Sequence, residues 1–191
     1  MSWRYLKTHA APVLLGAGMM LALAIGTLGG EAALSTTSFC TACHSMSYPA
    51  QELRKSKHYG TLGLDPQCKD CHIPQGLGNL HLAVWAHLAD GTRDLIREFA
   101  GDYSTIQKFN ERRLEMAHFA RMAMKKDDSL TCRACHRDSR PAVAEGKEAH
   151  KKLQAGRATC IDCHQNLVHK EVPETDLDKS LAQGKMVLKE E

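Results

Sequence analysis

Aromatic residues and strand-like patterns are both scarce in this chain. Phe, Trp and Tyr together make up 5% of its 191 residues, and no segment alternates apolar with polar side chains as a half-buried strand does. With so few large rings, the side chains alone would form only a thin core. The sequence therefore excludes a sheet protein and predicts a mainly α fold with much irregular loop.

A strong charge of one sign is also missing. The 25 Lys and Arg residues nearly balance the 22 Asp and Glu residues, for a formal net charge of +3. Arg4 and Lys7, near the N-terminus, supply two of these charges, which leaves +1 for the remainder. Because nucleic-acid binding needs a basic patch, a nucleic-acid partner is excluded.

No charged residue occurs between Ala10 and Gly30, a run of 21 residues. As a helix rising about 1.5 Å per residue, the run would be roughly 30 Å long, enough to span a lipid bilayer. Basic residues precede it, so we expect residues 1–9 in the cytoplasm and residues 10–30 as an uncleaved transmembrane anchor. A cleaved secretion signal is the alternative. Glycines in the run permit close packing against a second copy, so the anchor also allows an oligomer.

No cysteine lies outside four copies of Cys-x-x-Cys-His, which begin at residues 40, 68, 132 and 160. Two thiols three positions apart can bond the two vinyl groups of a haem, and the histidine that follows can bind its iron. Zinc and thiol-redox sites also use paired cysteines but do not need that histidine. With 11 histidines in the chain, the odds that one follows all four pairs by chance are roughly one in a hundred thousand. The pattern predicts four covalent haem c groups, attached through Cys40, Cys43, Cys68, Cys71, Cys132, Cys135, Cys160 and Cys163 and bound by His44, His72, His136 and His164.

The motifs form two pairs, at residues 40–72 and 132–164. The spacing is 28 residues within each pair and 92 residues between the pairs, and His58 and His150 also lie 92 residues apart. This repeat indicates an internal two-haem duplication in a domain of residues 31–172, followed by a flexible tail of residues 173–191. Because haem c is attached on the outer side of the bacterial inner membrane, we expect this domain to be periplasmic.

Each low-spin haem iron needs a second axial ligand, and neutral imidazole is its commonest source. Besides His9, on the cytoplasmic side, the histidines outside the motifs are His58, His81, His87, His118, His150 and His169. The repeat favours His58 and His150. His118 falls in a helix expected from Thr105 to Lys126, where an apolar stripe favours ordinary packing; the stripe is Ile106, Phe109, Met116, Ala120 and Met124. Helices are also expected over residues 77–99, interrupted at Gly91 and with Trp85 at the membrane interface, and over residues 141–153.

An anchor followed by two pairs of haem motifs resembles the NapC/NirT family of membrane-anchored tetrahaem quinol dehydrogenases, over nearly the whole chain. The resemblance is carried by Cys-x-x-Cys-His-x-Met at residues 40–46, Asp-Leu at 94–95, Gln-Lys-Phe at 107–109 and the segment 160–169. It implies one N-terminal transmembrane helix plus a compact periplasmic multihaem domain.

The resemblance also implies the ligands of each iron. At haem 1 it makes Met46 an axial ligand, with His44 in the same motif and Asp94 near the opposite face. It pairs His72 with His169 at haem 2, His136 with His58 at haem 3, and His164 with His150 at haem 4. From the residues alone, the iron that each distal histidine meets stays open.

For a quinol substrate, the resemblance implies that Asp94 is the general base that accepts a proton. Asp90 is the alternative base. The family has a lysine one or two helical turns before the acidic residue, and this chain has none there. His87, seven positions before Asp94, is the nearest replacement, because an imidazole can donate a hydrogen bond or relay a proton.

Together these features predict a protein that oxidises membrane quinol at haem 1 and passes electrons to a periplasmic reductase. A nitrate or other oxyanion reductase is the expected acceptor, reached directly or through a cytochrome subunit. The choice between ubiquinol and menaquinol stays open. The alternative is a passive membrane-tethered carrier without its own quinol site. A haem enzyme acting on nitrite or hydroxylamine would instead require a five-coordinate haem with a substrate cavity.

Overall fold

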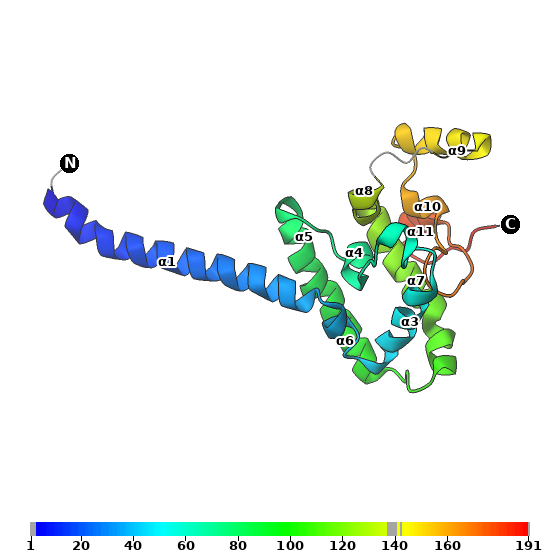
Figure 1. Ribbon diagram of the computed structural model, residues 1–191, viewed down its shortest axis with the longest axis horizontal. Coiled ribbons are helices and arrows are strands. Elements are labelled where there is room, and N and C mark those ends of the chain that lie inside the picture. Colours follow the sequence, from blue (N-terminus) through cyan, green and yellow to red (C-terminus); the bar gives the residue numbers. More distant parts are fainter. Residues whose placement is uncertain (1–2, 137–140, 142, 191) are drawn as a thin grey trace.

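A computed structural model describes residues 3–136, 141 and 143–190. It opens with one long helix, α1 (Trp3–Leu34), which projects from the rest of the chain (Figure 1). Its part from His9 to Leu34 is long and apolar enough to cross a membrane, and none of its most apolar stretch is buried inside the protein. The helix therefore continues four residues beyond the expected end of the anchor at residue 30, through Glu31.

The described residues beyond α1 fold into short helices joined by irregular loops. The helices are α2 (Thr37–Cys40), η1 (His44–Met46), α3 (Ser47–Lys55), η2 (Thr61–Gly63), α4 (Cys68–His72), η3 (Leu77–Asn79), α5 (Leu80–Trp85), η4 (Ala86–Asp90), α6 (Gly91–Ala100), α7 (Ile106–Lys126), α8 (Leu130–Cys135), α9 (Ala144–Gln154), α10 (Cys160–Cys163) and α11 (Leu177–Gln183). No strand occurs in this part of the chain. The predicted mainly α fold is confirmed.

A two-residue link, Ser35 and Thr36, joins α1 to α2, and α2 ends at the first residue of the first haem motif. Ser35 donates a hydrogen bond to Oε1 of Glu31 at 2.7 Å, and the Thr36 side chain accepts one from the backbone N–H of Phe39, which caps α2. Cys40, the first residue of the motif, thus follows the end of α1 by only six residues. The link keeps this motif close to the end of α1.

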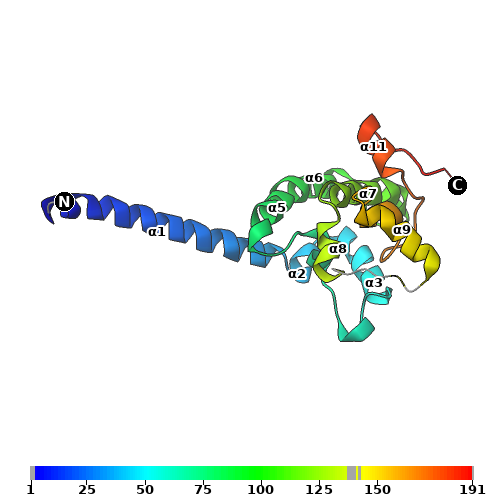
Figure 2. The same ribbon diagram turned by 90° about the horizontal axis from the view of Figure 1, so that it is seen from above.

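Helices α5, η4 and α6 form one continuous segment that crosses the end of α1 obliquely, and α5 contacts α1 (Figures 1 and 2). The expected interruption at Gly91 takes the form of a π-helical turn, η4, that ends just before it. Helix α6 packs on α7 through two arginines, since the guanidinium carbons of Arg93 and Arg97 lie 4.1 and 5.4 Å from the ring centre of Phe119. These contacts fix one side of α6 against α7.

The protein core is as thin as the composition suggests. Among the described residues, the buried hydrophobic side chains are Leu53, Ala83, Phe109, Ile161 and Leu177. Helix α7 buries Phe109 of the predicted stripe, but its other two buried residues are Arg113 and Arg121. Each arginine has polar partners that offset the cost of burying its charge, so the helix packs through salt bridges as well as apolar contacts.

Residues 173–190, which the sequence predicts to be a flexible tail, lie folded against α7 in the structure. Thr175 pairs with Leu188 in an antiparallel bridge, α11 lies between them, and Thr175 and Leu177 are buried. Arg121 of α7 donates to the carbonyl of Pro173 at 3.0 Å. Contacts from α7, which is distant in the sequence, hold this segment in place. The segment therefore folds without a periodic pattern of its own.

Candidate functional site

The four haem motifs lie on four short helices that follow one another through the domain. Helix α2 contacts α4, and α4 contacts α8. Burial and the neighbouring thiol of Cys132 raise the pKa of Cys71 to about 11, and burial and the Cys160 thiol raise the pKa of Cys132. None of the eight cysteines forms a disulfide. The order of the motifs along the chain is therefore also their order in space.

The second motif of each half has its own helix cap. In α4, Oδ2 of Asp70 accepts from the backbone N–H of Gln67 at 2.7 Å, and in α10, Oδ2 of Asp162 accepts from that of Thr159, also at 2.7 Å. Both aspartates stand between the two cysteines of their motif and close a capping box. This shared device supports the internal duplication that the spacing predicts.

Three motif histidines each face a second imidazole. The ring centres lie 6.4 Å apart for His136 and His58, 6.2 Å for His72 and His169, and 6.3 Å for His164 and His150. Two imidazoles on opposite sides of one metal ion, each at about 2 Å from nitrogen to metal, have ring centres about 6 Å apart. These pairs are the ones expected for haems 2, 3 and 4, and their spacing fits an iron between the rings.

The surroundings of the histidines distinguish a haem site from a zinc site. Nδ1 of His58 is buried and has no hydrogen-bond partner among the described residues, which indicates a neighbouring group that the protein itself does not supply. A zinc site would instead need a tighter set of ligands. In the described part of the chain, no three His, Cys, Asp or Glu side chains gather closely enough to hold a metal ion. The residues fit haem better than zinc.

The first motif differs from the other three. Nε2 of His44 lies 3.1 Å from the hydroxyl of Tyr48, and the two rings meet edge to face with their centres 5.4 Å apart. Among the described residues, no second imidazole packs against His44. Met46 ends the short helix η1 that begins at His44. Tyr48 in turn packs on Phe109 of α7, with ring centres 5.2 Å apart.

Helix α6 reaches the first motif through Glu98. Its carboxylate accepts hydrogen bonds from the side chain and the backbone N–H of Ser45, which is buried within η1. Glu98 follows Asp94 by four residues, about one helical turn, so both carboxylates lie on the side of α6 that faces this motif. Asp94 therefore lies one helical turn before the residue that joins α6 to this motif.

Asp94 and Asp90 have different surroundings. Partial burial raises the pKa of Asp94, although Arg97 opposes the shift. Asp94 has no hydrogen bond or ion pair among the described residues, whereas Asp90 accepts from Arg93 at 2.9 Å. A carboxylate that is not held in an ion pair with an arginine accepts a proton more readily, which favours Asp94 as the base.

His87 lies in the π-helical turn, with Nδ1 3.0 Å from the carbonyl oxygen of Ala83. Because a carbonyl oxygen only accepts, Nδ1 of His87 must carry the proton. No hydrogen bond joins His87 to Asp94 in the described part of the chain. Its free nitrogen is therefore Nε2, which accepts a hydrogen bond when the ring is neutral.

The sequence did not predict that Glu52 and Arg113 would support His169. Arg113 donates two hydrogen bonds to Glu52, and Oε2 of Glu52 lies 3.6 Å from Nδ1 of His169. Burial lowers the pKa of His169, although Glu52 opposes the shift. A carboxylate behind a ligand histidine fixes the orientation of its ring. The signal for this arrangement was Arg113 itself, four residues after Phe109 on the buried side of α7.

The two histidines without an expected role lie elsewhere. Nδ1 of His118 is 3.3 Å from the hydroxyl of Thr175, in the contact between α7 and the C-terminal segment, and burial lowers the pKa of His118. His81 is exposed on α5. His118 thus has the packing role that its helix predicted.

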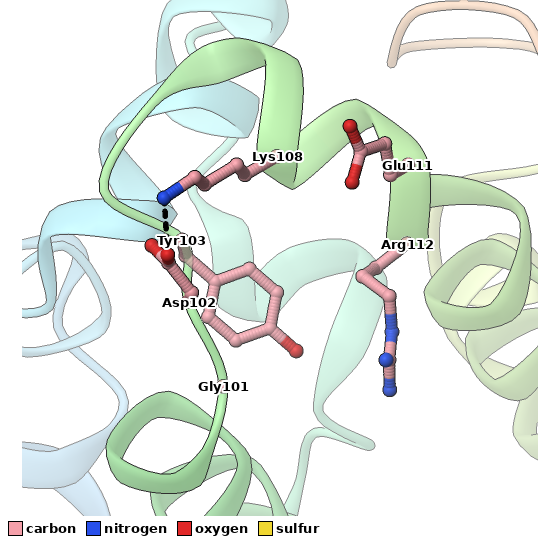
Figure 3. Close-up of a pocket in the computed structure, with 6 residues that line it drawn as sticks. All are labelled: Gly101, Asp102, Tyr103, Lys108, Glu111 and Arg112. Carbon is pink, nitrogen blue, oxygen red and sulfur yellow. Dashed lines mark hydrogen bonds and ion pairs between the residues drawn. The ribbon is translucent and has the colours of Figure 1, made fainter.

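A surface cleft lies between α6 and the start of α7 (Figure 3). Lys108 pairs with Asp102 on one side of it, and Tyr103 projects between them and Arg112. Neither a haem motif nor Asp94 lines this cleft. It is a junction between two helices, separate from the redox site.

Comparison with known proteins identifies the family. The chain matches the NapC/NirT cytochrome c family, N-terminal region, over residues 4–175. It is 58% identical over 188 residues to a probable tetraheme cytochrome c-type protein of Nitrosomonas europaea, covering 98% of this chain and 81% of that protein. A cytochrome c-type protein NapC of Haemophilus influenzae is 34% identical over 141 residues, covering 71% of this chain and 68% of that protein.

A cytochrome c-type protein TorY of Haemophilus influenzae is 36% identical over 159 residues, and the chain spans only 42% of its length. No solved structure matches the chain. The family match and the first relative each cover most of the chain, which carries four haem motifs behind an apolar helix. The chain belongs to the NapC/NirT cytochrome c family and is a membrane-anchored tetrahaem c-type cytochrome of electron transport.

Proposed function

We propose that this protein oxidises membrane quinol beside its first haem motif and delivers the electrons to a periplasmic reductase. The observation that carries the proposal is the contrast between His44 and the other motif histidines. Three of them face a second imidazole, whereas His44 meets Tyr48. The first motif has no second imidazole from the described part of the chain and begins six residues after the membrane helix. Such a site suits a substrate that arrives from the bilayer.

The residues that would hold the four haems are the eight motif cysteines, the four motif histidines, Met46 and the distal histidines His169, His58 and His150. When bound, the haems would take up and release single electrons. The chain itself supplies the proton chemistry, because oxidation of a quinol to a quinone releases two protons together with two electrons.

Asp94 is the residue that we propose as the proton acceptor. Its carboxylate forms no ion pair with an arginine among the described residues, and it lies one helical turn before Glu98, which connects α6 to Ser45. A raised pKa brings the carboxylate closer to the pKa of a quinol hydroxyl and so improves it as a general base. Glu98 would hold α6 in position for this transfer.

His87 would act beside Asp94 as an acceptor. Since its Nδ1 donates to Ala83, its Nε2 can accept a hydrogen bond from a quinol hydroxyl. This refines the expectation that His87 donates to the substrate, because the donating nitrogen already has a partner within the helix. A relay of the second proton through Nε2 remains consistent with this tautomer.

We also propose the orientation and the acceptor. The N-terminus is cytoplasmic and the haem domain periplasmic in the bacterial inner membrane, as the basic residues before the anchor favour. The acceptor is an oxyanion reductase, such as a nitrate reductase, or its cytochrome subunit. The resemblance of the motifs supports this part of the proposal.

The test is reduction of the purified, haem-loaded protein by a quinol in lipid nanodiscs, followed by haem absorbance. We expect inhibitor-sensitive reduction by the wild type and a rate about 100-fold lower in Asp94→Asn, the usual contribution of one general base. Asp90→Asn is the matched control and should stay within about threefold of wild type. A wild-type rate in Asp94→Asn would remove Asp94 from this role. No reduction of the wild type without an added dehydrogenase would support the passive carrier.

A further inference from the structure

Around the end of the membrane helix, the domain exposes large apolar side chains. Leu77, Trp85 and Leu88, on η3, α5 and η4, are 79%, 67% and 65% exposed, and Phe39 on α2 is 52% exposed. We call these four residues the apolar collar. Both α2 and α5 contact α1, so the collar continues from the surface of the membrane helix.

The collar belongs to two long uncharged segments. No Asp, Glu, Lys or Arg occurs in residues 32–51 or in residues 73–89, and charge resumes at Glu52 and Asp90. By contrast, the rest of the domain is richly charged, as its salt bridges on α6, α7 and α9 illustrate. An uncharged surface that adjoins a membrane-spanning helix is the surface expected to meet lipid.

Trp85 and Leu88 also face away from the protein. Ala83 is the buried residue of α5. Trp85 follows Ala83 by two residues, or about 200° around the α-helix, so its side chain projects from the side of α5 opposite to the packed side. Leu88 lies in the π-helical turn η4 and is exposed.

We propose that the apolar collar rests in the interfacial layer of the outer leaflet, as a second contact between this protein and the bilayer. Indole and leucine side chains are well suited to this layer, since the ring of Trp85 can bury its apolar surface and keep its N–H near the headgroups. The contact would hold the first haem motif at a fixed height above the membrane. It does not require quinol oxidation, because a passive carrier with the same anchor would make it too.

The test uses single introduced thiols. In the haem-loaded full chain the eight native cysteines are bonded to haem, so Leu77→Cys and Leu88→Cys each provide one free thiol. Leu181→Cys is the matched control, because Leu181 is 51% exposed and belongs to α11, a helix that lies away from α1 (Figure 1). Each variant is placed in nanodiscs that hold a single copy and is treated with a charged maleimide.

We expect Leu77→Cys and Leu88→Cys to react at least about tenfold more slowly than Leu181→Cys, since the reagent must reach a thiol within lipid. Spin labels at the two collar sites should collide more with dissolved oxygen than with a water-soluble nickel complex, and the label at residue 181 should do the opposite. Equal maleimide rates at the three sites would overturn the proposal. Protection of the spin labels from both oxygen and nickel would mean that haem or protein covers the collar. Protection of the thiols only in discs that hold two copies would mean that a second copy covers it. Either result would also overturn the proposal.

Discussion

Arg113 on α7 and Glu52 on α3 form a two-point ion pair, with Nη2 donating to Oε1 at 2.8 Å and Nη1 to Oε2 at 2.9 Å. The pair joins residues 61 positions apart, and the same carboxylate accepts from the backbone N–H of Lys170 at 3.1 Å. Glu52 therefore links three separate segments, and His169 stands beside it.

The first prediction concerns this pair. Glu52→Gln leaves the buried guanidinium of Arg113 without a counter-charge, which should lower the free energy of unfolding by about 2–3 kcal/mol, below the full cost of breaking a buried pair because Glu52 is partly exposed. Denaturant unfolding of the haem-loaded protein measures the change. The control is Glu115→Gln, which loses ion pairs that are exposed on both sides and should cost less than about 1 kcal/mol. Equal losses in the two variants would contradict the structural role of Glu52.

The second prediction concerns the ring planes of the histidine pairs. The planes of His72 and His169 are tilted by 33°, whereas those of His58 and His136 meet at 78° and those of His150 and His164 at 87°. The angle between two axial imidazoles sets the anisotropy of a ferric haem signal. Electron paramagnetic resonance should therefore show one rhombic bis-imidazole signal and two strongly anisotropic ones.

Single substitutions assign those signals. We expect His169→Met to remove the rhombic signal, and His58→Met and His150→Met each to remove one anisotropic signal. His118→Met is the control, because His118 contacts Thr175 and should leave every signal in place. An unchanged spectrum in His58→Met would eliminate it as a ligand.

The third prediction is the pH dependence of quinol oxidation. Partial burial raises the pKa of Asp94 above its usual value of about 3.9. A base acts only when it is ionised, so the rate should fall as the pH falls through this raised pKa, and the midpoint should lie above about pH 4. The measurement is the initial rate of haem reduction from pH 4 to pH 8. In Asp94→Asn this step should be absent, and its persistence would assign it to another group.

The fourth prediction concerns Asp162, which holds the helix cap of the fourth motif and pairs with Lys125 at 2.7 Å. Burial acts to raise the pKa of Asp162, but hydrogen bonds from Lys125 and Thr159 outweigh it and hold the pKa below its usual range. A lowered folded pKa means that the stabilisation is complete above the unfolded pKa of about 3.9 and is lost as the pH falls through the folded value.

Asp162→Asn should therefore lower the free energy of unfolding by about 1–3 kcal/mol at pH 7, and the difference from wild type should shrink below about pH 4. Denaturant unfolding at the two pH values tests this. Asp178 pairs with the same lysine but is exposed, so Asp178→Asn should cost less than about 1 kcal/mol at either pH. A loss in Asp162→Asn that is independent of pH would show that its charge is not the cause.

The helical fold and the anchor could be read from the chain because they depend on local composition. A run without charge from Ala10 to Gly30 needs only its neighbours to form an apolar helix, and the structure extends it to Leu34. The C-terminal segment could not be read in this way. Its order depends on Arg121 and Lys125 of α7, which lie some 50 residues earlier and give no local signal in the segment itself.

The buried arginines mark the limit of reading hydrophobic periodicity. A stripe of apolar residues predicted the buried side of α7, and Phe109 lies on it. Arg113 and Arg121 are also buried on α7, because acceptors elsewhere in the chain offset the cost of burying their charge. A pattern that counts only apolar residues overlooks such positions.

By itself, the sequence determined the number of haem motifs and the membrane helix, because each depends on residues that are adjacent in the chain. Only the tertiary structure decided how distant residues meet: the three imidazole pairs at 6.2–6.4 Å, the different surroundings of His44 and the approach of Glu98 to Ser45. The physical reason is that spacing along a chain fixes bonds and helices, whereas the separation of two rings depends on how the helices pack.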